Sequence, residues 1–431
     1  MNMKKLAPTL LAILLLAGAV LAVHFFQKNS SSEKPAASGA SQTASDQLVN
    51  TPAGEESQAE QPPGGQIVLE GEMRAVWVPY LSLDQSKIGQ GQEAFQKAFD
   101  EIVSQAKEYG LNTLIVHVRP FGDAMYPSEI YPWSHLLTGT QGGDPGFDPL
   151  EYMVRKTHEA GMQFHAWLNP LRIQSKGTPS ILAPDHLYTQ WREDSDPNND
   201  DWVVDWEEGK YFNPAYPEVR EKIIEGIREI VENYPVDAIH FDDYFYPTTA
   251  EDFDAQCFAA QTEFDDLAKW RLNNISLMVG EIYSAVKAVD KDILVGVSPQ
   301  GNMENNYEYM YADVKKWCSE EGYIDYICPQ IYFGYENSVK PYEDTLQQWA
   351  DICTTDVTLV AGLGVYKIDS ESEFSENIGI IGRQINDAVV SYNYAGAAVY
   401  GYASLFGGSD RGVQEQVCIE IAFDKLDTSV K

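Results

Sequence analysis

From about Glu72 to the end of the chain one pattern recurs: a short apolar run, a polar or aromatic end, and then an amphipathic stretch. The runs are rich in β-branched and aromatic residues, which is typical of parallel strands buried on both faces. Eight such runs are present: Met73–Val78, Thr113–Val118, Gln163–Leu168, Ala238–Phe241, Ile293–Val297, Tyr323–Cys328, Thr358–Leu363 and Ala397–Tyr400. Eight parallel strands alternating with helices predict an α/β fold, a single (β/α)8 TIM barrel.

The amphipathic stretches between these runs carry the signals of helices. Apolar residues from Phe95 to Ala106 recur at a spacing of three to four, and Gly110 follows as a helix end. Asp148 and Pro149 are typical of an N-cap and a first helical residue. A doubly wound open sheet is the alternative, but the glycine-rich phosphate loop that often follows its first strand is missing here.

Residues 1–27 resemble a membrane-directed segment. Two lysines lie within Met1–Lys5, and an apolar run follows from Leu6 to Phe26. This is a secretory signal or an uncleaved anchor, and we favour the anchor. The lysines keep the N-terminus inside, so the rest is expected to be secreted or anchored to the outer side of the cytoplasmic membrane, facing the cell wall. The composition of residues 28–71 predicts a disordered linker, followed by one domain at 72–431.

Charge and residue usage exclude several classes of function. Acidic residues outnumber basic ones 65 to 30, for a net charge of −35, so nucleic acid is not an expected partner. The five cysteines show no CxxC spacing, so we expect buried free thiols rather than a zinc site, and a single disulfide stays open. No organic cofactor is expected. The 25 tyrosines suit a surface that binds polar, flat-faced groups such as sugar rings.

In a barrel of this kind the chemistry lies at the C-terminal ends of the strands, and one end is especially informative. The fourth run is followed by two adjacent acids, Asp242 and Asp243. Alternation puts His240 and Asp242 on one face, so Asp242 is expected at the barrel mouth. Two neighbouring acids repel each other, which can raise the pKa of one of them. Glycoside hydrolysis needs one protonated and one ionised carboxyl.

A carboxyl from another strand end is the favoured partner of Asp242, because sequence neighbours rarely flank a scissile bond. The candidate catalytic acids are Asp242, Asp243, Asp123, Glu304 and Glu336. Polar and aromatic side chains at the strand ends can bond sugar hydroxyls and stack on sugar faces. The expected substrate-binding residues are Arg119, Asn169, Arg172, His240, Gln330, Tyr332, Trp167, Tyr244 and Tyr80. A structural interpretation stays open, in which Asp243 merely caps a turn.

A metal-dependent hydrolase is a further interpretation, because His117, His165 and His240 lie on three consecutive strands. By alternation these histidines point inward, as do Arg119 and Asn169. Barrel hydrolases that bind metal gather histidines at strand ends, although the His-x-His pair that many carry on the first strand is missing here. The histidines could equally form hydrogen bonds within the barrel, and no metal is expected.

Seven sequence strings occur in order over about Glu72 to Leu405. They are Arg74-Ala-Val-Trp-Val78, Val118-Arg-Pro-Phe-Gly-Asp-Ala-Met-Tyr-Pro-Ser128, Trp167-Leu-Asn-Pro-Leu-Arg172, Tyr211-Phe-Asn-Pro214, Ile239-His-Phe-Asp-Asp-Tyr-Phe-Tyr-Pro247, Val297-Ser-Pro299 and Asp325-Tyr-Ile-Cys-Pro-Gln-Ile-Tyr332. Together they resemble the glycosyl hydrolase-like 10 family. This resemblance implies a barrel of bacterial envelope proteins, some of which cut the glycan strands of peptidoglycan, with Asp242 and Asp243 as catalytic candidates. Phe121 and Phe333 depart from the family pattern, which could alter a subsite.

We therefore expect an extracytoplasmic glycoside hydrolase that cleaves O-glycosyl bonds in glycan strands, with cell-wall peptidoglycan as the substrate. Carboxylate acid/base chemistry at the barrel mouth would carry the reaction. A non-catalytic glycan-binding barrel and a metal-dependent hydrolase stay open as alternatives. Contact with the membrane is expected through the N-terminal segment only.

Overall fold

The computed structural model of the chain describes residues 71–429, with the backbone alone at 426–429. The predicted membrane-directed segment, residues 1–27, lies outside the described residues, and so does the predicted linker up to residue 70. Within residues 71–429, no helix combines the length and the apolar character that a membrane span needs.

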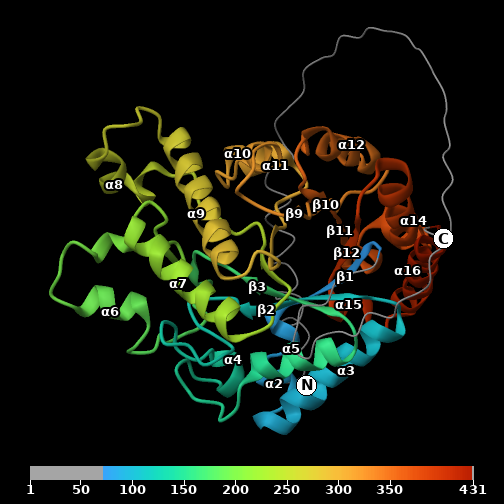
Figure 1. Cartoon of the computed structure of the whole chain (residues 1–431), viewed down its shortest axis with the longest axis horizontal. Coiled ribbons are helices and arrows are strands. Elements are labelled where there is room, and N and C mark those ends of the chain that lie inside the picture. The colour runs from blue at the N-terminus through green and yellow to red at the C-terminus, as the bar shows by residue number, and fades with distance from the viewer. Residues whose placement is uncertain (1–70, 430–431) are drawn as a thin grey trace, which may run out of the picture. The chain divides into compact units, whose positions relative to one another are not determined.

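A parallel sheet lies at the centre of the described domain (Figure 1). Its strands are β1 (Met73–Val78), β2 (Thr113–Arg119), β3 (Gln163–Leu168), β7 (Ala238–Phe241), β8 (Leu294–Val297), β9 (Tyr326–Ile327), β10 (Thr358–Leu359), β11 (Ala361–Gly364) and β12 (Gly396–Tyr400). They pair in the order β10-β9-β8-β7-β3-β2-β1-β12-β11, and every pairing is parallel. Each predicted run overlaps one of these strands, with bounds that agree or differ by a few residues, except that Thr358–Leu363 overlaps both β10 and β11.

The two ends of this strand order meet in one stretch of chain. β10 pairs with β9 and β11 pairs with β12, and only Val360 separates β10 from β11. The backbone N–H of Val360 donates to the carbonyl of Ile327 at 2.9 Å, which continues the pairing with β9. The sheet therefore wraps round on itself, and the predicted α/β barrel is confirmed.

Helices follow the barrel strands and surround them in Figure 1. The helices between successive strand positions, and after the last one, are α3 (Gly91–Glu108), α5 (Pro149–Glu159), α7 (Pro217–Asn233), α9 (Leu267–Val289), α11 (Val314–Ser319), α12 (Tyr342–Ile352), α14 (Ile380–Asn386) and α16 (Asp410–Ser429). Shorter helices are α2 (Gln85–Ile88), α4 (His135–Thr138), α6 (Leu187–Glu193), α8 (Ala255–Ala260), α10 (Met303–Glu308), α13 (Ser372–Glu376) and α15 (Tyr402–Leu405).

The predicted helix signals are those that the structure uses. In α3 the apolar residues from Phe95 to Ala106 are buried against the sheet. In α5 the carboxylate of Asp148 accepts the backbone N–H of Glu151 at 3.0 Å, and Pro149 begins the helix. An apolar stripe at helical spacing and an N-cap acid were sufficient to place both elements.

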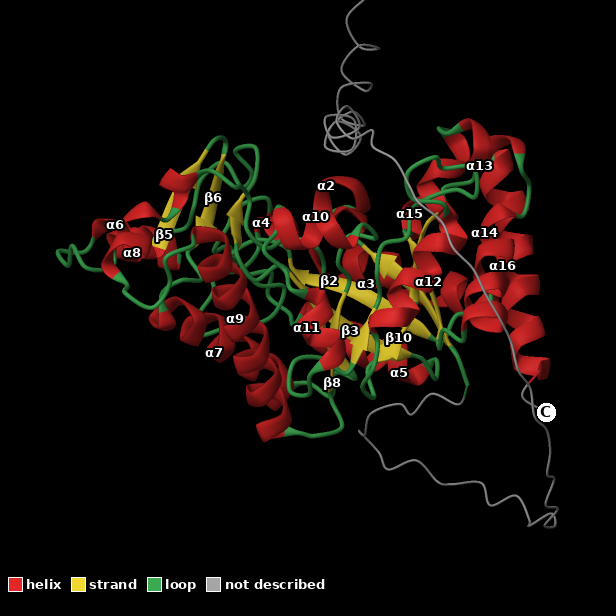
Figure 2. Cartoon of the chain, turned by 90° about the horizontal axis from the view of Figure 1, so that it is seen from above, coloured by secondary structure: helices red, strands yellow, loops and turns green. Residues whose placement is uncertain are grey.

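A small antiparallel sheet is inserted between β3 and α7. It consists of β4 (Arg172–Gln174), β5 (Val203–Trp206) and β6 (Gly209–Phe212), paired in the order β4-β6-β5. Figure 2 shows β5 and β6 on the same side as α6 and α8, apart from the barrel strands. Sequence periodicity did not predict this sheet, because strands of three or four residues are too short to show a period.

Large side chains fill the inside of the barrel. The interior cluster contains Met73, Ala75, Trp77, Ile115, Trp167, Ala238, Tyr326, Cys328, Val360 and Ala398. The ring of Tyr326 crosses to β8 where Gly296 leaves room, since a Cβ atom at Gly296 would lie 1.9 Å from that ring. The interior is thus a packed core and not a channel.

All five cysteines are free thiols, and Cys318 and Cys328 are buried. The Cys318 thiol lies within hydrogen-bonding reach of the sulfur of Cys353. Cys257 and Cys418 are half-buried, so the prediction of buried thiols holds for only two of the five.

Candidate active site

Beneath the barrel mouth, buried polar side chains form a hydrogen-bonded chain. Nε1 of Trp77 donates to Nε2 of His240 at 3.2 Å, which puts the proton of a neutral His240 ring on Nδ1. That Nδ1 lies 2.7 Å from the Tyr326 hydroxyl, which lies 2.9 Å from Nδ1 of His165. Nε2 of His165 is 3.0 Å from Oε1 of Gln163. Every ring nitrogen along this chain therefore has a partner.

These contacts bear on the interpretation of a histidine metal site. Burial lowers the pKa of His165 to about 4 and that of His240 well below its usual value, so both rings are neutral. His117 instead stacks on Trp167, with ring centres 3.8 Å apart. Among residues 71–429 there is no cluster of three or more His, Cys, Asp or Glu side chains that could hold a metal ion. The metal-dependent alternative has no ligand set in this part of the chain.

Asp242 follows β7 directly and is 5% exposed. Nδ2 of Asn169 donates to both of its oxygens at 2.7 Å, and Nε1 of Trp167 donates to Oδ2 at 3.1 Å. The backbone N–H of Tyr244 donates to Oδ1 at 3.0 Å. Because all of these groups are donors, they suit an ionised carboxylate and offer no acceptor for a carboxyl proton.

Asp243 has a more open environment. It is half-buried, and its Oδ1 accepts Nε2 of Gln330 at 3.2 Å. In the structure the turn is capped by Asp242 and not by Asp243, because the carboxylate of Asp242 accepts the backbone N–H of Tyr244 two residues later. Asp243 is therefore the member of the pair whose carboxyl is available to a substrate.

Burial and mutual repulsion raise the pKa of both carboxyls. For Asp242, burial and then the charge of Asp243 raise the pKa to about 7, opposed by the guanidinium of Arg172. Burial also raises the pKa of Asp243, opposed by the amide of Gln330. The pair thus shares one proton near neutral pH and titrates jointly. Both oxygens of Asp242 already accept hydrogen bonds, and Asp243 is the less buried of the two, so Asp243 is the member placed to carry that proton to a substrate.

The segment after β3 holds Asp242 in place. Asn169 directs its Nδ2 to Asp242 and its Oδ1 to the guanidinium of Arg172, which donates to it. That guanidinium lies 5.0 Å from the ring centre of Phe121 and 4.6 Å from that of Tyr244. The structure therefore brings the predicted binding residues Asn169, Arg172 and Tyr244 together around Asp242.

Three tyrosine rings, which we call the tyrosine wall, come from other strand ends. They are Tyr332, Tyr366 and Tyr400, and their ring centres lie 5.9 to 6.2 Å apart. Burial and the charges of Asp242 and Asp243 raise the pKa of Tyr400 to about 12, so its hydroxyl stays a neutral donor. Only Tyr332 was among the predicted binding residues. Tyr400 was treated as part of the last predicted strand and not as a binding residue. Its position as the final residue of that strand could have indicated a place at the barrel mouth.

Tyr80 also lies among aromatic side chains, after β1. Its ring centre is 5.4 Å from that of His117 and 5.4 Å from that of Phe121. Burial and the charge of Arg172 lower the pKa of His117 well below its usual value. This group connects the stacked pair of His117 and Trp167 to the rings around Arg172.

The predicted inward position of Arg119 was wrong. The pairing of β2 with β3 shifts register between His117 and Arg119, so that Arg119 pairs with Leu168. Leu168 belongs to the core outside the barrel interior, and the guanidinium of Arg119 lies 4.5 Å from the ring centre of Tyr131. The side chain is fully buried there. Arg119 therefore packs between sheet and surrounding layer, and not at the mouth.

Asp123, a predicted partner of Asp242, is fully buried in the segment after β2. Its Oδ2 accepts Nε2 of Gln141 at 3.1 Å and lies 3.3 Å from Nδ1 of His135. These contacts tie α4 and the residues after it to the end of β2, which is a structural role.

Glu304 and Glu336, the other predicted partners, lie at the surface. Glu304 is 60% exposed and accepts the ammonium of Lys340 at 2.5 Å. Glu336 is exposed, and its backbone N–H donates to Glu373 at 3.1 Å. Neither is a hydrogen-bonding partner of Asp242 within residues 71–429.

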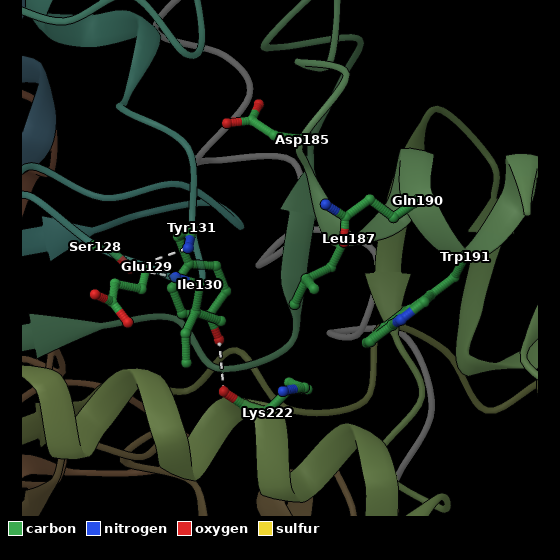
Figure 3. Close-up of a pocket in the computed structure, with 9 residues that line it drawn as sticks. All are labelled: Ser128, Glu129, Ile130, Tyr131, Asp185, Leu187, Gln190, Trp191 and Lys222. Carbon is green, nitrogen blue, oxygen red and sulfur yellow. Dashed lines mark hydrogen bonds between the residues drawn. The ribbon is translucent and has the colours of Figure 1, made fainter.

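A separate pocket of about 280 Å³ lies between the segment after β2, α6 and α7 (Figure 3). Its lining residues are Ser128, Glu129, Ile130, Tyr131, Asp185, Leu187, Gln190, Trp191 and Lys222. The Tyr131 hydroxyl donates to the backbone carbonyl of Lys222 at 3.3 Å across its floor. None of these residues contacts the acid pair, so this pocket is distinct from the barrel mouth.

Known proteins resemble this chain over most of its domain. The model of the family described as Glycosyl hydrolase-like 10 matches residues 72–378. Glycosyl hydrolase YngK of Bacillus subtilis (strain 168) is 35% identical over 323 residues, which cover 69% of this chain and 62% of that protein. Glycosyl hydrolase DigH of Escherichia coli (strain K12) is 31% identical over 387 residues, covering 80% of this chain and 86% of that protein. The chain thus spans less than two thirds of the length of YngK.

Solved structures share the fold. The PgaB (BpsB) glycoside hydrolase domain of Bordetella bronchiseptica has a TM-score of 0.54 at 11% identity, covering 80% of this chain and 98% of that one. The endo-beta-1,4-mannanase of Thermotoga petrophila has a TM-score of 0.51 at 15% identity, covering 84% and 78%. At such identities the likeness concerns the fold alone. The match of the family model and of DigH over most of the chain shows that this protein belongs to the glycosyl hydrolase-like 10 family.

Proposed function

We propose that this protein is an extracytoplasmic glycoside hydrolase that cleaves the glycan strands of cell-wall peptidoglycan. The observation that carries the proposal is the pair Asp242 and Asp243 at the barrel mouth, which shares one proton near neutral pH. Such a pair supplies the protonated and the ionised carboxyl that glycoside hydrolysis needs. The relatives YngK and DigH are both named glycosyl hydrolases, which supports the same reaction class.

The two carboxyls have different parts in this reaction. Asp243 donates its proton to the leaving oxygen as the bond to the anomeric carbon breaks. Asp242 stays ionised among its donors and stabilises the positive charge that develops on the sugar. Tyr244 is 52% exposed, and together with the tyrosine wall it offers flat faces on which sugar rings stack.

The place of action and the substrate rest on the sequence. The lysines and apolar run within residues 1–27 support a position outside the cytoplasmic membrane, secreted or anchored there. A glycan hydrolase in that position faces the cell wall. The net charge of −35 favours an uncharged or weakly charged glycan over a strongly anionic polymer such as nucleic acid.

The test uses purified peptidoglycan glycan strands without stem peptides, with release of reducing ends as the readout. We expect the wild type to release reducing ends, and Asp242→Asn and Asp243→Asn each to lower the rate by about a thousandfold. Asp351→Asn is the matched control, since Asp351 is exposed on α12 and accepts a hydrogen bond from Gln347 on the same helix at 2.7 Å. This control should keep the wild-type rate, and a thermal melt should show all three variants folded.

Two results would overturn the proposal. Wild-type rates in folded Asp242→Asn and Asp243→Asn would remove the acid pair from the reaction. Saturable binding of the strands without any product, unchanged in both variants, would instead identify a glycan-binding barrel.

A further inference from the structure

The acid pair has a geometry that limits how it can cut a glycosidic bond. Asp242 and Asp243 are consecutive residues after β7, so both carboxyls come from one strand end, whereas a protein acid and a protein nucleophile lie on opposite sides of the bond that they cleave. With Asp243 as the acid beside the leaving oxygen, the attacking group has to reach the anomeric carbon from the opposite face of the sugar. Asp242, the immediate neighbour of Asp243, approaches from the same strand end.

Among the described residues, no third carboxyl is bonded to the pair. Within residues 71–429, the side chains that hydrogen-bond Asp242 or Asp243 are those of Asn169, Trp167, Gln330 and Gln300. None of these is acidic. The three other candidate acids are committed elsewhere, one fully buried behind the end of β2 and two at the surface. The groups that chiefly shift the pKa of Asp242 and Asp243 also include no acid besides these two, so within residues 71–429 no third carboxylate stands beside the pair.

Asp242 is itself poorly placed to act as that nucleophile. It is 5% exposed, and donors from Asn169, Trp167 and the backbone of Tyr244 occupy both of its oxygens. To form a bond with an anomeric carbon, one oxygen would have to leave these partners and move into the mouth. Held where it is, an ionised carboxylate can accept one more hydrogen bond from a substrate N–H and orient the group that carries it.

We propose that the attacking nucleophile is the 2-acetamido group of the substrate, so that the protein cuts glycans on the anomeric side of a 2-acetamido sugar. This inference rests on the proposed function and adds to it the substrate group that takes part in the reaction. Asp243 is the acid and then the base. Asp242 is the acceptor that holds the acetamido N–H.

The bonds and protons balance in two steps. In the first, the acetamido oxygen bonds to the anomeric carbon, the bond from that carbon to the leaving oxygen breaks, and the proton of Asp243 passes to the leaving oxygen. In the second, water bonds to the anomeric carbon, the ring bond to the acetamido oxygen breaks, and Asp243 takes one proton from the water. The acetamido group and both carboxyls end as they began, and no external oxidant or reductant is needed.

The first test varies the nucleophile alone. Glycan strands are de-N-acetylated and then re-acylated with acetyl, fluoroacetyl or trifluoroacetyl groups, which progressively weaken the amide oxygen as a nucleophile. We expect the re-acetylated strands to be cut at the rate of untreated strands. The trifluoroacetylated strands should be cut at least about a hundredfold more slowly, because their weakened amide oxygen no longer attacks the anomeric carbon efficiently.

The outcomes separate this inference from the proposed function. Equal rates on all acylated forms and on de-N-acetylated strands would overturn the acetamido nucleophile and leave a glycoside hydrolase in place. Failure to cut even untreated and re-acetylated strands would overturn both. A graded fall in rate along the acyl series supports both.

The second test measures binding, and it does not depend on turnover. A sugar whose acetamido group is fused to the anomeric carbon as a thiazoline mimics the bicyclic product of the first step. We expect calorimetry to show tight binding to the wild type and to the Asp351→Asn control, and at least tenfold weaker binding to Asp242→Asn. Binding that is equally weak in all three, or equally tight in all three, would overturn the role given to Asp242.

Discussion

Two buried polar regions of the same barrel are built in opposite ways. In the interior, His240, Tyr326 and His165 form a chain in which each ring nitrogen and the hydroxyl have partners of complementary kind. At the mouth, Asp242 and Asp243 are like charges in adjacent positions, and burial and repulsion raise the pKa of Asp242 to about 7. Burial of polar groups is common to both regions. What distinguishes the mouth is the repulsion between two neighbouring carboxyls, which adds to burial in raising the pKa of Asp242. Groups with pKa values perturbed in this way are typical of functional sites.

The largest expected effect concerns stability against pH. The folded pair keeps a proton up to about pH 7, whereas an unfolded Asp releases it near pH 4. The shared proton therefore contributes fully to the free energy of unfolding below about pH 4, and this contribution is lost as the pH rises towards 7. Asp242→Asn should remove up to about 3 kcal/mol of this decline, as measured by urea unfolding between pH 4.5 and pH 7.5. Asp351→Asn is the control, and its unfolding free energy should change with pH as that of the wild type does. If the unfolding free energy of Asp242→Asn also changes with pH as in the wild type, the raised pKa of Asp242 is contradicted.

A smaller effect is expected from Asn169→Ala. Asn169 donates to both oxygens of Asp242 and thereby lowers its pKa, so its loss raises the pKa of the pair further. The acid limb of the pH–rate profile should then move to higher pH, with a rate loss of about tenfold to a hundredfold at neutral pH. The measurement is kcat/KM for glycan-strand cleavage from pH 4 to pH 8. If the acid limb stays in place, Asn169 does not control the ionisation of Asp242.

The interior chain should respond through stability instead of through rate. Tyr326→Phe leaves a buried nitrogen on His165 and another on His240 without a partner, which costs about 1 to 3 kcal/mol of unfolding free energy. Tyr402→Phe is the matched control, because the Tyr402 hydroxyl bonds Gln105 at a half-buried position where water can replace it. Denaturant unfolding measures both variants. A loss of glycan cleavage larger than the loss of stability explains would place this chain in the reaction.

The smallest effect is expected from Glu304→Gln. Glu304 is 60% exposed, and the ammonium of Lys340 outweighs its partial burial to hold its pKa below the usual value. An exposed pair of this kind contributes about 1 kcal/mol or less. Cleavage rate and unfolding free energy should both stay near wild type. A large loss of rate would reopen the assignment of Glu304 as a partner acid.

The sequence predicted the regular parts of this fold and less of its site. Strand bounds at Met73–Val78, Gln163–Leu168 and Ala238–Phe241 are those of the structure, since buried parallel strands leave an unbroken apolar signal. The position of Arg119 was not predictable, because a register shift in the backbone reverses the face to which a side chain points and leaves no mark in composition. The contrast between Asp242 and Asp243 depends on donors from other strands, which alternation along one strand does not reveal.

Arg172 links the acid pair to a part of the molecule that lies outside the barrel. It is the first residue of β4 in the inserted sheet, and it also donates to Asn169 and opposes the raised pKa of Asp242. The inserted sheet therefore carries a residue that helps to set the ionisation of the acid pair. A change in the sequence of this insertion that moved Arg172 would therefore alter the ionisation of the acid pair. An insertion outside the barrel can in this way shift the pH optimum without any change at the strand ends.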